Sequence, residues 1–412
     1  MRWLTCNRAD PEDVVRYKST LNQIDAWWKE FEKQAGKLDR VFKQEVEWDL
    51  VGWMDRYLSR IGPNLMWEFG PAVNIDGHRL VITPEAHREM RPLVNEIIAR
   101  APNIPGWEFY AWRCADPMDM LANTVEGRTG LDCSEVTVAV SIGDHHRIDL
   151  AYVWNDFPDE EDQALHASFV ITETLLGEQV LDQWVGGIDP FPKSSKSIKG
   201  QRLLPLERLQ QTVQAAISSI VDQLPDTPYA SAADLSATPD DEKWSLFKLE
   251  PEPADDYPAR TDMMTCLTCY EEMTRATFSP ETFYSCRFAR HGEIFCYVKV
   301  DGSEDLTEMK FGDREEMEKA ATEALFAEGL GGLIGGGTGL KYAYIELALT
   351  DVDRGIAAVR KAMQDGRVPK RSWILFHDSD WVREWVGIYD DSPEPPLIPL
   401  PDDDEVEVDD DE

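Results

Sequence analysis

Basic residues are scarce in this chain. It carries 41 Lys and Arg against 78 Asp and Glu, which gives a formal net charge of −37. Because a surface this negative repels phosphate and attracts basic protein, we expect no binding to nucleic acid or to anionic membranes. The acids extend to the end of the chain, since the stretch from Asp390 to Glu412 holds twelve acids and no Lys or Arg.

Long apolar runs are also lacking. No stretch approaches the ~20 continuous apolar residues that a membrane-spanning helix needs. The opening residues from Met1 to Cys6 contain no apolar segment typical of a secretory signal, so we expect a cytoplasmic protein. The seven cysteines are scattered and odd in number. We therefore expect reduced thiols rather than disulfides.

Core-forming residues, in contrast, are plentiful. Apolar residues make up 42% of the 412, and 14 are Trp, which is enough for two domains of ordinary size. Each domain is expected to be an α+β sandwich of helices on a sheet, ferredoxin-like in part, with mostly antiparallel strands. The predicted organisation is an N-terminal domain over 1–225, a linker over 226–243, a C-terminal domain over 244–390 and a disordered acidic tail over 391–412.

The clearest helix signal lies near the start of the chain. Apolar residues recur at spacings of three and four from Val14 to Leu38, and Asp10 followed by Pro11 is typical of a helix start. This apolar seam spans little more than three heptads. We therefore expect it to dock on its own domain, although a dimer formed through the seam remains an alternative.

Strands follow in both halves. Val136–Ile142 and Ile148–Trp154 alternate apolar and polar residues around a short turn, which predicts an antiparallel hairpin. Leu80–Trp112 and Tyr342–Phe376 each read as strand, helix, strand, the order of a crossover unit.

The rest of the second half mixes helix and strand signals. We predict a helix across Met263–Met273 and a hairpin from Phe283 to Val300. Asp313 and Glu316 form the pattern of a capping box, which predicts a helix running to Ala327.

A glycine-rich stretch, with Gly335, Gly337 and Gly339 as candidate binding residues, follows the helix that ends near Ala327. A phosphate-binding loop would follow a strand, open a helix and carry a Lys before Ser or Thr, and this stretch does none of these. We interpret it as a turned or mobile connector. The alternative is a loop that grips a ligand, with Glu346 or Asp351 nearby as the carboxylate of an enzyme.

The other reactive residue types give no assembled centre. Cys266, Cys269, Cys286 and Cys296 lack the paired spacing of a zinc ribbon, so we expect buried thiols and neither metal nor cofactor. His145 and His146 are expected to be solvated at the hairpin tip.

The segment from His377 to Asp380 is interpreted as a polar loop, because sequence adjacency does not make a catalytic pair. Trp381 and Trp385, close to the acidic tail, are the tryptophans expected to be exposed. Bordered by carboxylates, they are candidate anchors for a basic partner.

The segments Leu176-Gly177-Glu178 and Trp184-Val185-Gly186-Gly187-Ile188 carry a family resemblance. Together they resemble a motif of the uncharacterised bacterial domains related to RraB-type regulators of ribonuclease E, over about residues 40–190. The resemblance implies a small ferredoxin-like domain with a binding or regulatory role. That family supplies no catalytic residues to carry over.

These observations favour a non-catalytic regulatory or immunity-like protein whose acidic surface engages a basic protein partner. Electrostatic steering would bring the partner in, and docking on an aromatic patch would follow. The alternative is an enzyme with a small-molecule pocket near Gly335–Gly339.

Overall fold

A computed structural model describes residues 10–227, 244–303, 306–396 and 398. It shows mixed helix and sheet with largely antiparallel sheets. The chain divides into two compact units: unit 1 holds Met1–Pro228, Glu272–Ile294 and His377–Val382, and unit 2 holds the remainder. The C-terminal half thus contributes two segments to unit 1. Most of the predicted linker and tail lies outside the described residues.

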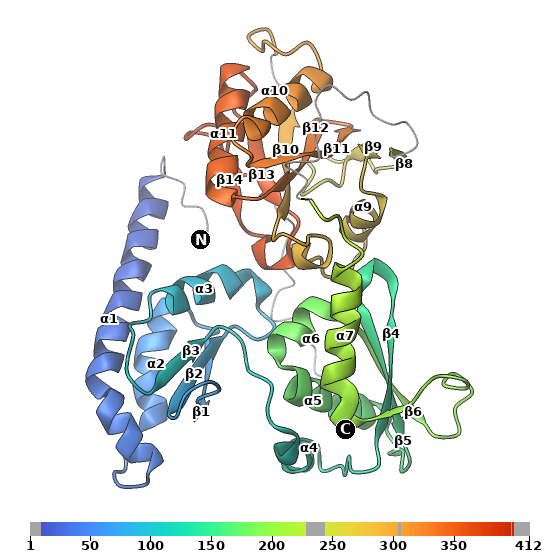
Figure 1. The fold of residues 1–412 in the computed structure, drawn as a ribbon. Coiled ribbons are helices and arrows are strands. Elements are labelled where there is room, and N and C mark those ends of the chain that lie inside the picture. The colour runs from blue at the N-terminus through green and yellow to red at the C-terminus, as the bar shows by residue number, and fades with distance from the viewer. Residues whose placement is uncertain (1–9, 228–243, 304–305, 397, 399–412) are drawn as a thin grey trace, which may run out of the picture. The chain divides into compact units, whose positions relative to one another are not determined.

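Unit 1 begins with a helical and a three-stranded layer, followed by a second sheet with its own helices (Figure 1). Its elements are α1 (Pro11–Phe42), α2 (Leu50–Ile61), β1 (Met66–Pro71), β2 (His78–Thr83), η1 (Arg88–Met90), α3 (Arg91–Ala99), β3 (Trp107–Tyr110), α4 (Leu121–Thr129), β4 (Thr137–Ile142), β5 (Ile148–Trp154), α5 (Glu161–Leu176), α6 (Glu178–Trp184), β6 (Val185–Pro192), β7 (Leu204–Pro205), α7 (Leu209–Val221), η6 (Ser285–Arg287) and η7 (Ser379–Trp381).

The first helix begins where the sequence predicts. The Asp10 side chain caps α1 by accepting a hydrogen bond from the Glu12 amide at 2.9 Å. The seam of α1 packs into an aromatic core with α2, α3 and the β1-β2-β3 sheet, as the buried Trp28 and Phe31 illustrate. Docking on its own domain is therefore confirmed. Pro92 lies in the first turn of α3, where its missing N–H costs nothing.

The second sheet of unit 1 has the order β6-β5-β4-β7. The predicted hairpin is confirmed, with Val140 opposite Leu150 in the antiparallel β4–β5 pair. Helices α4, α5 and α7 contribute to one core with this sheet, in which Tyr152 and Trp154 are fully buried. Strands β2 and β3 pair in parallel around α3, which confirms the first crossover unit.

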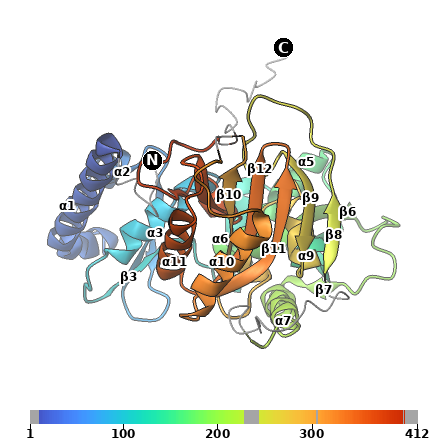
Figure 2. The ribbon, with the colours of Figure 1, turned by 90° about the horizontal axis from the view of Figure 1, so that it is seen from above.

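Unit 2 is a seven-stranded sheet of order β14-β13-β10-β12-β11-β9-β8. Helices α10 and α11 lie side by side on one of its faces (Figure 2). Its elements are β8 (Ser245–Lys248), β9 (Met263–Thr268), β10 (Ile294–Asp301), α10 (Arg314–Phe326), β11 (Gly331–Gly339), β12 (Tyr342–Leu349), α11 (Val352–Asp365), β13 (Ser372–Phe376) and β14 (Trp385–Gly387). Helix α9 (Glu271–Thr277) belongs to unit 1 from its second residue onward.

Helix α10 begins at the predicted cap, because Asp313 accepts a hydrogen bond from the Glu316 amide at 3.0 Å. Two other predictions for unit 2 are wrong. Residues 263–268 form strand β9 rather than a helix, and the predicted hairpin is replaced by the turn η6 followed by β10. In both places sheet pairing with distant strands decides the structure, and local periodicity does not reveal it.

The glycine-rich stretch is also not a connector. Residues 331–339 form strand β11, which pairs with β12 on one side and with β9 on the other. The glycines allow close approach, because a Cβ at Gly335 would lie 2.5 Å from the Leu267 carbonyl oxygen. In the part of the chain that the structure describes, no helix is long and apolar enough to cross a membrane.

Candidate functional site

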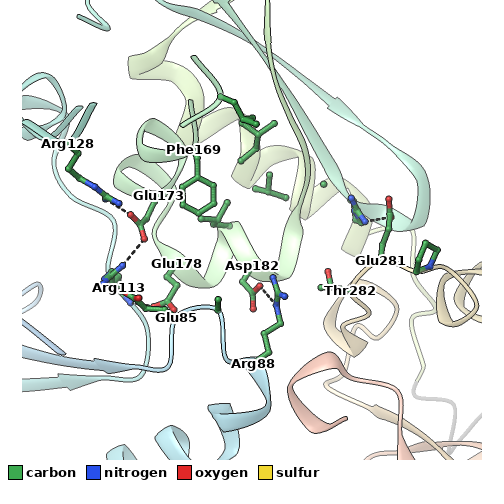
Figure 3. A pocket seen from close by; sticks show the side chains of 18 residues that line it. Glu85, Arg88, Arg113, Arg128, Phe169, Glu173, Glu178, Asp182, Glu281 and Thr282 are labelled. Atoms are coloured by element: carbon green, nitrogen blue, oxygen red, sulfur yellow. Dashed lines mark hydrogen bonds and ion pairs between the residues drawn. The ribbon is translucent and has the colours of Figure 1, made fainter. Parts of the chain in front are cut away.

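Unit 1 contains a pocket of about 840 Å³ (Figure 3). Helices α5 and α6 and strand β6 supply its apolar surface, and segments before α3 and after β3 supply much of the charge. Its lining is Glu85, Ala86, Arg88, Arg113, Arg128, Arg147, Leu165, Phe169, Glu173, Glu178, Leu181, Asp182, Val185, Gly186, Ile188, Pro280, Glu281 and Thr282. The volume is in the range of ligand-binding pockets.

The apolar part of the pocket is open to water. Leu165 and Phe169 are each 42% exposed and are spaced one helical turn apart on α5. Because residues four apart share a helix face, the two side chains form one apolar strip. Leu181, Val185 and Ile188 extend the apolar surface. An aromatic ring left open to water in a concave site is typical of an anchor position for a ligand.

Charged pairs surround the apolar strip. Glu173 lies near the centre of one wall, where its carboxylate accepts hydrogen bonds from Arg113 at 3.0 Å and from Arg128 at 2.6 Å (Figure 3). Arg113 also pairs with Glu85. The Glu173 side chain is only 11% exposed. Its ion pairs with the two arginines therefore hold the side chains of this wall in place.

The other walls repeat this arrangement. Arg88 donates from Nε to Asp182 at 2.7 Å, and Arg147 pairs with Glu281. In total the lining contains five carboxylates and four arginines. A ligand therefore meets an apolar strip whose surrounding charges are already paired within the protein.

A buried network around Glu178, one of the lining residues, joins α6 to α3 and to the segment after β3 in unit 1. Glu178, 7% exposed, accepts hydrogen bonds from Arg91 at 3.0 Å, from the Arg113 amide at 2.8 Å and from the Thr83 hydroxyl at 2.5 Å. The Arg91 guanidinium also lies 3.3 Å from the centre of the Trp112 ring. Because Arg91 is only 1% exposed, these contacts compensate the loss of water around its guanidinium.

The motif that carries the family resemblance builds part of this site. Gly177 has a φ of +77°, and a Cβ there would lie 2.9 Å from the Ala115 amide nitrogen, so the position requires glycine. At Gly186 a Cβ would lie 2.4 Å from Asp149 and 2.9 Å from Arg147. Glycine thus allows the Arg147 side chain to lie against β6 and reach the pocket.

A second cluster of acids lies next to Asp182. Tyr284 donates to or accepts from both Asp182 and Asp380, the latter at 3.0 Å. Asp378 accepts hydrogen bonds from the amide and the hydroxyl of Ser285. Burial raises the pKa of Asp380 to about 7 and that of Asp378 to about 6. The expected polar loop from His377 to Asp380 therefore carries two buried acids.

The candidate binding residues from the sequence lie elsewhere. Gly335, Gly337 and Gly339 belong to β11 of unit 2. Trp385 is only 5% exposed in β14, so the expected exposure is wrong there, while Trp381 is partly exposed in η7. Trp385 was expected to be exposed because it lies close to the acidic tail in the sequence. In the structure, pairing of β14 with β13 places it in the sheet, where it is buried.

Most of the residues that the sequence suggested for catalysis or metal binding are buried or bonded to other parts of the protein. Glu346 points inward at 3% exposure and pairs with Arg260 at 2.7 Å. Cys266 is buried in β9, where desolvation raises its thiol pKa to about 12 and so disfavours the thiolate that metal binding needs. His146 bonds the Arg287 carbonyl oxygen through Nδ1 at 2.7 Å, so the expected solvated tip is wrong.

Among the described residues, no group of three or more His, Cys, Asp and Glu side chains is placed to hold a metal ion. Sequence reasoning missed the pocket because its arginines and glutamates come from six separate segments with no common spacing. The one available signal was the Leu176–Ile188 motif, whose Glu178, Val185, Gly186 and Ile188 all line it.

Comparisons with known proteins give no relative from which a role could be read. No protein-family model matches the chain, and neither a curated protein nor a solved structure matches it at a significant level.

Proposed function

We propose that this protein binds a basic protein partner and that the unit 1 pocket receives an apolar side chain of that partner. The open apolar strip of Leu165 and Phe169, enclosed by fixed charges, is the observation that carries the proposal. Protein interfaces commonly combine a desolvated apolar anchor with a polar rim. A partner segment with Lys or Arg beside a Leu or Phe would satisfy both features.

The charge of the whole chain supports a basic partner. A formal charge of −37 creates a long-range field that speeds encounter with cations and weakens as salt screens it. The pocket itself adds little net charge, because its arginines are already paired. Steering is therefore assigned to the protein surface, and specificity to the pocket.

The resemblance to RraB-type regulators, which implies a binding role, is in keeping with this proposal. Its motif residues Glu178 and Gly186 line the pocket, so the shared pattern and the candidate site coincide. We extend the proposal to a cytoplasmic, non-catalytic regulator.

We also propose a ferredoxin-like arrangement for the centre of unit 2. The elements β10, α10, β11, β12, α11 and β13 follow the order strand-helix-strand-strand-helix-strand. In the sheet these strands are ordered β13-β10-β12-β11, with both helices on one face. This order supports the arrangement.

The enzymatic alternative at Gly335–Gly339 has weaker support. Neighbouring atoms occupy the space beside these glycines, for example the Glu318 carboxylate at Gly336 and the Asp262 carboxylate at Gly339. Glu346, the carboxylate considered for catalysis, is paired with Arg260. The geometry thus favours the pocket of unit 1.

Replacing Phe169 with alanine is expected to weaken partner binding. Fluorescence anisotropy would be measured with short synthetic peptides that present Leu or Phe flanked by lysines, and with a matched set flanked by glutamates. The lysine-flanked peptides are expected to bind more tightly than the glutamate-flanked peptides. Their affinity is expected to fall as the salt concentration is raised. Loss of the half-exposed ring should weaken binding by about 1–2 kcal/mol, roughly 5- to 30-fold.

The matched control is Phe326→Ala. Phe326 is 43% exposed on α10 of unit 2 and does not line the pocket, so the substitution removes a ring of similar exposure outside the site. Equal binding of the lysine and glutamate sets would contradict a basic partner. Unchanged affinity in Phe169→Ala would remove the pocket from the proposal.

A further inference from the structure

Tyr284 places a single hydroxyl between two carboxyl groups of unit 1. One is Asp182, on α6 in the wall of the pocket, and the other is Asp380 in η7, whose Oδ1 lies 3.0 Å from the tyrosine oxygen. A tyrosine hydroxyl has one proton to donate. It can therefore donate to one carboxylate only, and the second contact is a hydrogen bond only if that carboxyl group donates to the tyrosine oxygen.

We infer that Asp182, Tyr284 and Asp380 share one additional proton, and that the affinity of the pocket for its ligand depends on that proton. The second part rests on the proposed function. In this arrangement Tyr284 donates to ionised Asp182, and protonated Asp380 donates to the oxygen of Tyr284.

The surroundings assign the proton to Asp380. Asp182 accepts a hydrogen bond from the Arg88 guanidinium at 2.7 Å, so a cation is bonded directly to this carboxylate. Asp380 is 7% exposed. The cation that acts on it from α3 is Arg91, and that guanidinium is already bonded to Glu178.

Burial is the largest cause that raises the pKa of Asp380, to about 7. The Arg91 guanidinium lowers this pKa, whereas Asp182 from α6 and Asp378 from its own segment raise it by repulsion. Arg88 of η1 bonds to Asp182 and also interacts with Tyr284.

Loss of the proton would change the pocket because Asp182 would move. With both carboxylates ionised, the Tyr284 proton satisfies only one of them, and the other oxygen faces the tyrosine oxygen without a proton between them. The two acids must then separate. Because Asp182 holds Arg88 in the pocket wall, the wall moves with it.

The first test uses the ligand-free protein and Asp380→Asn. The asparagine amide keeps a donor for Tyr284 and does not titrate, so it imitates the protonated acid. The ordinary Asp pKa is 3.8, so between about pH 4 and 7 the folded protein binds more protons at Asp380 than the unfolded chain does. Stability therefore falls as pH rises through this window.

In the wild-type protein this group should raise the unfolding equilibrium constant by up to tenfold per pH unit from about pH 4 to about pH 7, with no further change above. Urea titrations across this pH range would compare the wild-type protein with Asp380→Asn. In this variant the part of the pH dependence that comes from Asp380 is expected to vanish. The control is Asp189→Asn, an exposed carboxylate on β6 that should keep it. Identical pH profiles for wild-type protein and Asp380→Asn would overturn the shared proton.

The second test measures affinity for the lysine-flanked peptides at pH 6 and pH 8. Wild-type protein and Asp189→Asn are expected to bind about tenfold more weakly at pH 8, whereas Asp380→Asn should bind equally at both. Equal wild-type affinity at the two pH values would overturn the coupling to the pocket. A protein that bound the peptides at neither pH would overturn the proposed function and the coupling, while the unfolding profiles would still decide the shared proton.

Discussion

Replacing Glu178 with alanine is expected to destabilise unit 1 by about 3–5 kcal/mol, because it leaves a buried charge without its partner. Arg91 would keep its position over the Trp112 ring but lose the carboxylate that balances it. The Arg113 amide would lose its acceptor as well. Removing one partner of a surface ion pair costs little, whereas this substitution leaves a buried guanidinium without its carboxylate and so lowers the free energy of unfolding strongly.

Urea titration followed by circular dichroism would measure the effect, and hydrogen exchange of the β2 amides would assign it to unit 1. Glu126→Ala is the matched control, since Glu126 is exposed in the middle of α4 and alanine suits a helix. Glu178→Gln retains an acceptor oxygen and should cost less than alanine. A loss below about 1 kcal/mol for Glu178→Ala would show that the network is not a main support of unit 1.

The sequence predicts best where the signal is local. The α1 start at Asp10 and Pro11, the β4–β5 alternation and the Asp313 cap depend on residues a few positions apart, and all three are confirmed. Strand β9 depends on pairing with β11, about 70 residues later. Its own residues have both helix-like spacing and strand-forming types, so only the partner strand decides between them.

The candidate site was harder to predict for the same reason. Glu173 meets Arg113 and Arg128 across 60 and 45 residues, and Asp182 meets Tyr284 across 102. None of these pairs has a characteristic spacing. Exposure was equally hard to predict: Phe169 is 42% exposed in the pocket although it lies on a helix with a buried apolar face, whereas Trp385 was expected to be exposed and is buried.

Gly335→Ala is expected to lower the stability of unit 2 by about 1–3 kcal/mol. The new Cβ would lie 2.5 Å from the Leu267 carbonyl oxygen and 3.1 Å from the Thr268 Cα. Both are backbone atoms of the paired strand β9, so neither can rotate away, and the β9–β11 pair must open or shift. A flexible or ligand-gripping loop at this position would instead tolerate alanine without loss of stability.

Gly312→Ala provides the matched control within the same unit. A Cβ there would approach only the Glu316 side chain, at 3.7 Å or more, so stability should change little. Both variants would be compared by urea titration with hydrogen exchange of β9 and β11 as the local measure. Equal stability for the two variants would mean that the glycines of β11 are not required by close strand packing, and the ligand-binding interpretation of Gly335–Gly339 would regain its support.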